Sequence, residues 1–323
     1  MRSRRIQQPH ARPRGRPRGV GLALALALTA APATGFACSI CRCGDPTFNA
    51  LGKDGFAARG WRLALDWERF DKQEGDPALE SESQVENRIT AFASYGLGEK
   101  LTFFARVPYS IRHLDVSAPG LEPQRVRTNG LSDPEVYAQA RLWASRLSGG
   151  LGRRASLSLN AGVKAPWGEN ELRRGDGRAD EHAQPGTGST DVLASLAFLY
   201  LVDARSAVFV STGYRHTGAN GHGYRYGRSL LATAAYEHKL GERLDGVVEL
   251  DFRRAGRDRS DASGTLDEDT GGSLLYLTPR LLIDLGHGTV LRVAGQLPVA
   301  RGLNGHQRER AVLNVGLTYL FSR

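Results

Sequence analysis

The sequence is poor in cysteine and in long apolar runs, and each shortage excludes a class of protein. Only 3 cysteines occur among 323 residues, all between positions 38 and 43, which rules out a small fold stapled by many disulfides. After residue 37 no run approaches the roughly 18 apolar residues of a membrane-spanning helix. Phosphate-binding loops, dinucleotide fingerprints and zinc-protease motifs are also missing. We therefore expect a protein that is not an enzyme.

The first 37 residues are predicted to be a secretory signal peptide. Seven arginines and no acidic residue precede the apolar core "VGLALALALTAAPA", and Ala37 ends a small-x-small cleavage pattern. A mitochondrial presequence is the alternative, but the apolar core is continuous rather than amphipathic. Without this segment the 43 basic residues fall to 36 against 34 acidic ones, a net charge of +2. The high pI therefore gives no support to nucleic-acid binding.

The rest of the chain alternates between apolar and polar residues, the period of a strand with one apolar face. In "KLTFFARVPYSI", for example, Phe103, Val107 and Ile111 share one side, and Arg106 and Ser110 share the other. About twelve such segments are predicted: 60–70, 87–97, 100–112, 134–144, 154–166, 190–201, 206–215, 228–239, 244–255, 273–285, 288–299 and 310–321.

The connections between these segments alternate in length. Short Gly-containing links such as "GEK" and "GHG" alternate with longer ones at 71–86, 113–133, 167–189, 216–227, 256–272 and 300–309. This order predicts an all-β, transmembrane, up-and-down antiparallel β-barrel of about 12 strands, with short periplasmic turns and long extracellular loops. A soluble β-sandwich or lipocalin-like barrel is the alternative. Aromatic residues near strand ends on the apolar face favour the membrane barrel: Trp61, Tyr95, Tyr109, Tyr214, Tyr236, Phe252, Tyr319 and Phe321.

Charged residues occupy the polar face near the middle of many segments. In a membrane barrel this face encloses a water-filled lumen, so these residues are predicted to line it: Arg62, Asp66, Arg88, Arg106, Arg141, Lys164, Glu249, Asp251, Arg280, Asp284 and Arg292. Three prolines, Pro108, Pro279 and Pro298, fall inside predicted strands, where each removes a backbone hydrogen-bond donor. Pro108 and Pro298 lie near the outer-loop ends, where pairing can lapse, and Pro279 is expected to mark a bulge.

Two histidine-containing loops carry residue types found in chemical sites. "GRADEHAQ" places Asp180, Glu181 and His182 together, and "GYRHTGANGHGYRYG" places two histidines among three tyrosines. Ordinary solvated loops are the expected interpretation of both, ahead of a protease dyad or a metal or sugar site.

Two segments resemble a known family. "NGLSDPEVYAQARLW" (129–143) and "GVKAPWGENELRRGDGRADEHAQPGTGSTDVLASLAF" (162–198), together with the earlier "ARVPYSI", are similar to motifs of the phenol-degradation meta-pathway outer-membrane protein family. The resemblance spans roughly residues 57–323. Ser132 and Pro134 depart from the family pattern. Membership implies an outer-membrane channel for small, often hydrophobic compounds, and it implies no catalytic residues.

The three cysteines, Cys38, Cys41 and Cys43, would lie at the mature N-terminus, in the oxidising periplasm. Four fates remain open: a disulfide, a copper or zinc site, lipid attachment at Cys38, or attachment to a partner or cofactor. Haem attachment is excluded because Arg42 stands where a histidine is needed. The expected organisation is therefore a signal peptide (1–37), a periplasmic cysteine segment (38–56) and an outer-membrane barrel (57–323).

We predict a Gram-negative outer-membrane channel for a small solute, aromatic, hydrophobic or metal-related. The competing hypothesis is a barrel that serves as a scaffold for a periplasmic metal or electron carrier docked through the cysteine segment. Expected partners are outer-membrane lipid, the solute, the barrel-assembly machinery and a periplasmic protein. No cofactor is expected beyond copper or zinc at the cysteines.

Overall fold

The computed structural model describes residues 60–321 apart from 77–79, 121, 147–152, 175–176 and 261–263. The predicted signal peptide and cysteine segment lie outside these residues. Within the described ranges, no helix is long and apolar enough to cross a membrane.

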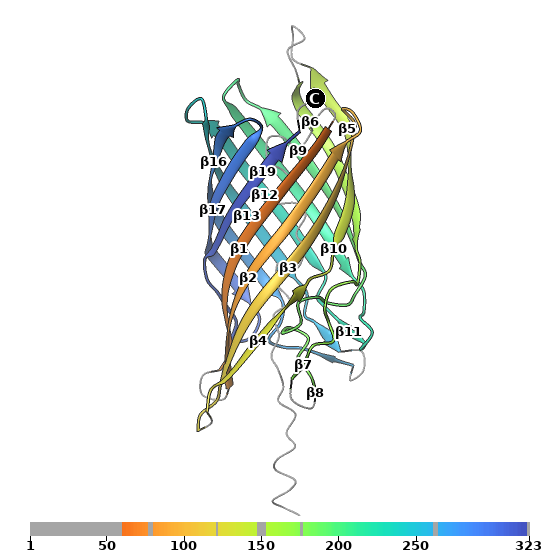
Figure 1. The fold of residues 1–323 in the computed structure, drawn as a ribbon, viewed down its shortest axis with the longest axis vertical. Helices are drawn as coiled ribbons and strands as arrows, with labels where there is room; N and C mark the ends of the chain where they lie inside the picture. Colours follow the sequence, from red (N-terminus) through yellow and green to blue (C-terminus); the bar gives the residue numbers. More distant parts are fainter. Residues whose placement is uncertain are drawn as a thin grey trace, which may run out of the picture. The chain divides into compact units, whose positions relative to one another are not determined.

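Twelve long antiparallel strands form a closed barrel, which confirms the predicted fold class (Figure 1). Each predicted segment overlaps one of them, in the same order along the chain. The strands are β1 (Gly60–Asp76), β2 (Glu80–Gly96), β3 (Leu101–Ser117), β5 (Glu135–Arg146), β6 (Arg153–Lys164), β9 (Asp191–Leu201), β10 (Ser206–Thr217), β12 (Ser229–Lys239), β13 (Leu244–Ala255), β16 (Gly272–Gly286), β17 (Thr289–Leu303) and β19 (Val312–Leu320).

The first and last strands close the barrel. Leu65 of β1 lies opposite Ala91 of β2 on one side and Leu317 of β19 on the other. A closed ring gives every strand two partners, so the backbone polar groups are satisfied without water. Closure is what allows such a sheet to sit in hydrocarbon.

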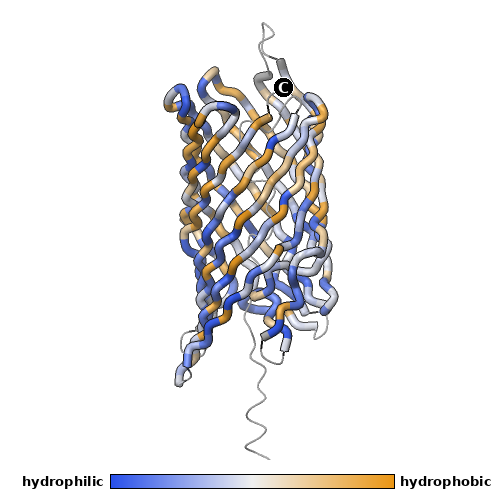
Figure 2. The backbone as a smooth tube through the Cα atoms, viewed as in Figure 1, coloured by the Kyte–Doolittle hydropathy of each residue, from blue (hydrophilic) through white to orange (hydrophobic). Residues whose placement is uncertain are grey.

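Side chains alternate between the two faces of the wall as the sequence predicts. On β3, Phe103 and Val107 are 47% and 43% exposed, whereas Thr102 and Arg106 are 3% and 2% exposed. Figure 2 shows the same alternation of apolar and polar positions along the strands. The apolar residues therefore face outward, towards lipid, and the charged residues face the barrel interior.

Aromatic side chains sit on the outward face near the short-turn end. The ring centroids of Trp61 and Tyr95 lie 4.9 Å apart, and those of Tyr319 and Phe321 lie 4.7 Å apart. This is the arrangement expected of residues at the membrane interface.

One side of the wall continues beyond the membrane belt, in segments predicted to be loops. The strands β1, β2 and β3 have 17 residues each, or roughly 56 Å at a strand rise of about 3.3 Å per residue. The predicted connection at 71–86 is mostly strand, and the connection at 113–133 contains β4 (Gln124–Leu131), which pairs with β3. These loop predictions were wrong because polar residues dominate the extension, and its few apolar residues do not form a sustained period-two pattern. The label "wall extension" is used below for residues 70–76, 80–87, 112–117 and 124–131.

Several two-residue strands lie in the long connections at the same end of the barrel. β18 (Arg308–Glu309) pairs with β1, inside the connection predicted at 300–309. The pair β7 (Arg173–Arg174) and β8 (Gly177–Arg178) lies between β6 and β9, and β11 (Tyr224–Arg225), β14 (Arg259–Ser260) and β15 (Thr265–Leu266) form a small sheet of their own.

The three prolines occupy places where the ladder lapses. Pro108 falls where the partner of β3 changes from β5 to β4. Pro298 lies beside a register shift between β16 and β17. Pro279 is at a break in the β16–β17 ladder that involves no register shift, so the expected bulge is not there. Each missing donor is thus placed at or beside an interrupted pairing.

Candidate functional site

The connection between β6 and β9, residues 165–190, folds over the long-loop opening of the barrel. We call it the mouth loop. Arg112 of β3 donates to the carbonyl of His182 at 2.7 Å and also to that of Gln184, and Thr128 of β4 donates to the carbonyl of Ala183 at 2.7 Å. Because these donors face the barrel interior, the loop lies across the opening rather than outside it.

The mouth loop has a defined internal structure. The Gln184 side chain accepts from the backbone of Leu172 at 3.0 Å and donates to the carbonyls of Leu172 and Ala179 at 3.0 and 2.9 Å. Arg178 pairs with Glu181 at 2.6 Å. A buried amide that satisfies both of its ends fixes one loop conformation.

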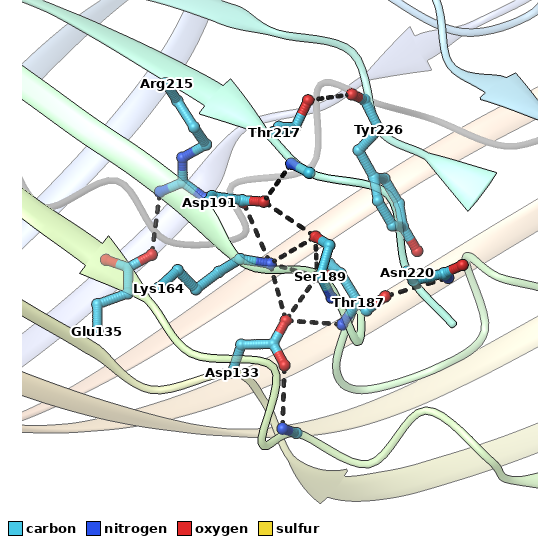
Figure 3. A network of polar contacts seen from close by, with 12 residues as sticks. Asp133, Glu135, Lys164, Thr187, Ser189, Asp191, Arg215, Thr217, Asn220 and Tyr226 are labelled. Atoms are coloured by element: carbon cyan, nitrogen blue, oxygen red, sulfur yellow. Dashed lines mark hydrogen bonds and ion pairs between the residues drawn. The ribbon is translucent and has the colours of Figure 1, made fainter. Parts of the chain in front are cut away.

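Asp133 and Lys164 hold the two ends of the mouth loop (Figure 3). The Asp133 carboxylate accepts from Gly168 N at 2.9 Å and from Thr187 N at 2.8 Å. Lys164 donates to Asp133 at 2.9 Å, and its side chain and that of Asp133 are 2% and 3% exposed. One buried ion pair therefore joins the first and last parts of the loop to the wall.

Glycines allow this close approach. A Cβ on Gly168 would lie 2.7 Å from the backbone nitrogen of Asp133, and a Cβ on Gly186 would lie 2.6 Å from the backbone of Gly168. Both glycines belong to the family-like segment 162–198. The close backbone contacts explain why glycine is needed at these two positions.

The pair continues into a chain of alternating charges. Lys164 also contacts Asp191 at 3.1 Å, and Arg215 lies 3.8 Å from Asp191. Arg215 contacts Glu135 at 3.0 Å, and Glu135 contacts Arg106 at 3.4 Å. We call these residues the ion-pair chain: Arg106, Asp133, Glu135, Lys164, Asp191 and Arg215. Its three cations and three anions balance, as buried charges require.

Asp133 is ionised in this setting. Burial opposes its ionisation, but the charge of Lys164 and the hydrogen bonds from Thr187 and Lys164 outweigh burial, so the pKa of Asp133 is below its usual value. The carboxylate is therefore charged throughout the neutral range.

A second contact joins the mouth loop to two neighbouring loops. His182 hydrogen-bonds Tyr224 at 2.8 Å, and Tyr224 donates to Asp258 at 3.0 Å. The rings of His182 and Tyr226 lie 5.3 Å apart. Burial, followed by the charge of Asp258, raises the pKa of Tyr224 far above its usual value. The expectation of solvated loops is wrong for His182 and Tyr224, which pack together.

Most residues predicted to line the lumen face the interior, and several of them are paired. Asp66 pairs with Arg292, Glu249 pairs with Arg280 at 3.0 Å, and Asp251 accepts from Thr233 and Thr278 at 3.0 and 2.7 Å. Eight of the eleven are buried: Asp66, Arg88, Arg106, Lys164, Glu249, Asp251, Arg280 and Arg292.

The other three lie nearer the ends of strands. Arg62 and Arg141 are half-buried. Asp284 is exposed close to the β16–β17 turn and accepts from Gly286 N at 2.8 Å. Its place near the turn suits a structural role better than a lining one.

Several members of the site were missed by sequence reasoning. Asp133 and Asp191 lie at strand boundaries, Glu135 follows a proline, and Arg215 ends a predicted segment. The signal that could have found the first two is the motif itself, since Asp133 lies in "NGLSDPEV" and Asp191 ends "GTGSTD".

The cysteine predictions fall outside the described residues. Among residues that the structure describes, no group of three His, Cys, Asp or Glu side chains is arranged to hold a metal ion.

The fold and the apolar outer face define a twelve-stranded transmembrane β-barrel of the outer-membrane type. The sequence profile described as "Putative MetA-pathway of phenol degradation" matches residues 68–299, so the chain belongs to that family. This confirms the resemblance seen in the sequence.

The chain is similar to several solved structures, and the first one named here has the same fold. The COG4313 outer membrane channel from Pseudomonas putida F1 is 13% identical, with a TM-score of 0.62 over 86% of this chain and 99% of that one. The translocator domain of the autotransporter NalP from Neisseria meningitidis is 14% identical, with a TM-score of 0.43 over 83% and 92%. The Ralstonia pickettii toluene transporter TbuX is 8% identical, with a TM-score of 0.41 over 82% and 90%. No curated protein matches the sequence.

Proposed function

We propose that this protein is a narrow outer-membrane channel for a small solute and that the mouth loop sets the size of its opening. One observation carries the proposal: the loop is fixed to inward-facing residues of β3, β4 and β6 by buried polar contacts. A loop held across the opening restricts passage, whereas a loop held outside the barrel would not.

The interior offers two kinds of surface to a solute. One is charged and internally paired, as described above. The other is apolar: the rings of Phe104 and Tyr137 stack at 4.7 Å, and Leu193 faces inward beside them. The guanidinium of Arg106 lies 5.6 Å from the centre of the Phe92 ring. A flat apolar solute with one polar or anionic group matches both surfaces, which agrees with the aromatic chemistry in the family's description.

We assign the solute pathway to the predicted lining residues other than Asp284. A charged side chain of the lining can leave its partner and bind a polar group of the passing solute. This contact replaces the water that the solute loses on entering the barrel.

Flux into proteoliposomes tests the function. Benzoate is a suitable aromatic probe because its charge limits unaided passage through lipid, and glucose is a polar probe of similar size. We expect both to enter faster than into empty liposomes, with benzoate preferred. Heat-unfolded protein in the same lipid is the control. Entry at the rate of empty liposomes would overturn the proposal.

The competing role, a scaffold for a periplasmic carrier, depends on Cys38, Cys41 and Cys43. Conductance of the barrel with and without residues 38–56 separates the two roles: a scaffold would show no conductance in either form. Titration of that segment with copper or zinc tests the metal site, and stoichiometric binding would favour it over a disulfide.

A further inference from the structure

On three neighbouring strands, the last lipid-facing position at the long-loop end is a basic residue. On β10 the outward positions run Val210, Thr212, Tyr214 and then His216. On β12, Arg228 precedes the outward Leu230, and on β13, Arg254 follows the outward Phe252. All three basic residues are exposed. They lie at the loop end of the apolar belt, not within it.

The register brings these residues together. Leu230 of β12 pairs with Arg254 of β13. Arg228 lies two residues before Leu230, and its carbonyl accepts from Gly256 N at 2.9 Å, so the pairing of the two chain segments continues past the strand ends. Arg215 pairs with Ser229, so His216 and Arg228 follow as neighbours. His216 and Arg228 thus lie directly opposite one another, whereas Arg228 and Arg254 are diagonal neighbours, which are about 7–8 Å apart. We call His216, Arg228 and Arg254 the outer basic cluster.

No acid balances this cluster on its own face. The outward positions of β10, β12 and β13 that lie between the cluster and the short turns include no Asp or Glu. None of the three residues forms an ion pair with any other residue that the structure describes.

Some exposed arginines elsewhere do have an acidic partner. On the wall extension Arg125 pairs with Asp115 at 3.3 Å, and Asp71 pairs with Arg310 of the adjoining connection at 3.3 Å. The outer basic cluster therefore presents positive charge that is not paired with an acidic residue anywhere in the described ranges.

We propose that the outer basic cluster binds the phosphate groups of a phosphorylated glycolipid in the outer leaflet. Long loops of such barrels face the cell exterior, so the cluster lies at the headgroup level of that leaflet. Arginine fits phosphate with two parallel hydrogen bonds, and its aliphatic stem can lie along the apolar belt while its charged head reaches the headgroups. Tyr214, Leu230 and Phe252 lie next to the cluster, where they would contact the acyl chains of the same lipid.

The test compares lipid A with lipid A lacking its phosphates, each added to the purified full chain in detergent and measured by native mass spectrometry. The variant is R228Q/R254Q. The matched control is K100Q/R243Q, which removes two exposed charges at the short-turn end of the barrel. Heat-modifiable gel mobility shows that each variant still forms a barrel.

We expect the wild type and the control to retain phosphorylated lipid A and R228Q/R254Q to bind it about tenfold or more weakly. Removal of the phosphates should weaken binding to the wild type and leave R228Q/R254Q unchanged. Equal binding of both lipids to the wild type, or equal losses in the two variants, would overturn the proposal. None of these results depends on whether the barrel conducts.

Discussion

The side chains of Asp133 and Lys164 meet at 2.9 Å at the long-loop end of the barrel wall. Asp133 binds backbone N–H groups from both ends of the mouth loop. Asp133 lies between β4 and β5, and Lys164 is the last residue of β6. This ion pair between residues 31 positions apart is therefore a main attachment of the loop that we propose shapes the opening.

Replacement of Lys164 by Met should release the mouth loop. Asp133 and Asp191 then lose their shared cation, and removal of one partner from a buried pair costs about 3–5 kcal/mol. We expect trypsin to cleave the folded barrel at Arg178, whose side chain is held in the wild type by Glu181 and by the carbonyl of Asn170. R125M is the control, because its exposed ion pair contributes little. Equal protection of K164M and the wild type would contradict this role.

The fastening should withstand moderate acid. The pKa of Asp133 is lowered, so its stabilising effect is complete above the ordinary value of 3.8 and is lost only as pH falls through the lower, folded-state pKa. Because Asp133 stays charged, this ion pair should cause no change in conductance between pH 8 and pH 5. In K164M the loop is already released, so no pH-dependent step of this origin should remain between pH 8 and 5. A wild-type transition near pH 6 that disappears in K164M would contradict the lowered pKa of Asp133.

Gly162 should not accept a side chain. A Cβ there would lie 2.2 Å from the Tyr137 Cβ and 2.5 Å from the Val136 carbonyl oxygen. G162A should therefore displace Tyr137 from its stack on Phe104 and destabilise the barrel by about 1–3 kcal/mol. Thermal unfolding followed by gel mobility measures this. G241A, at a turn position where nothing lies within 4 Å, is the control and should unfold like the wild type.

Charge reversal at Arg280 should change ion selectivity. Arg280 pairs with Glu249 at 3.0 Å, so R280E leaves two acids side by side and should shift the reversal potential towards cation preference. The swap R280E/E249R keeps the net charge and can remake the pair, so it should restore most of the wild-type selectivity. If R280E leaves the reversal potential unchanged, these residues do not line the pathway.

The membrane part of the fold was predictable from local alternation. All twelve barrel strands were found because each has lipid on one face, which leaves an apolar period in the sequence. The wall extension was missed for the same reason: residues such as Gln73 and Ser83 pair across strands that are mostly polar and have no lipid-facing side. Without an apolar face, a strand and a polar loop look alike.

The site was predictable only in part. Lys164 was identified as an inward-facing charge, but its partners Asp133 and Asp191 come from separate segments and meet only when the barrel closes. The period of a strand reports which way a side chain points, not what it meets. His182 shows the limit most plainly, since it lies in a charged, glycine-rich segment and is nevertheless buried against Tyr224.

Single-channel conductance of a variant with a shortened mouth loop tests the central claim most directly. Residues 170–184 would be replaced by a short Gly-Ser linker, which keeps Gly168, Thr187 and the ion-pair chain, and gel mobility would verify the barrel. The account predicts a larger conductance and faster benzoate entry than in the wild type. A variant that forms the barrel and conducts no more than the wild type would contradict it.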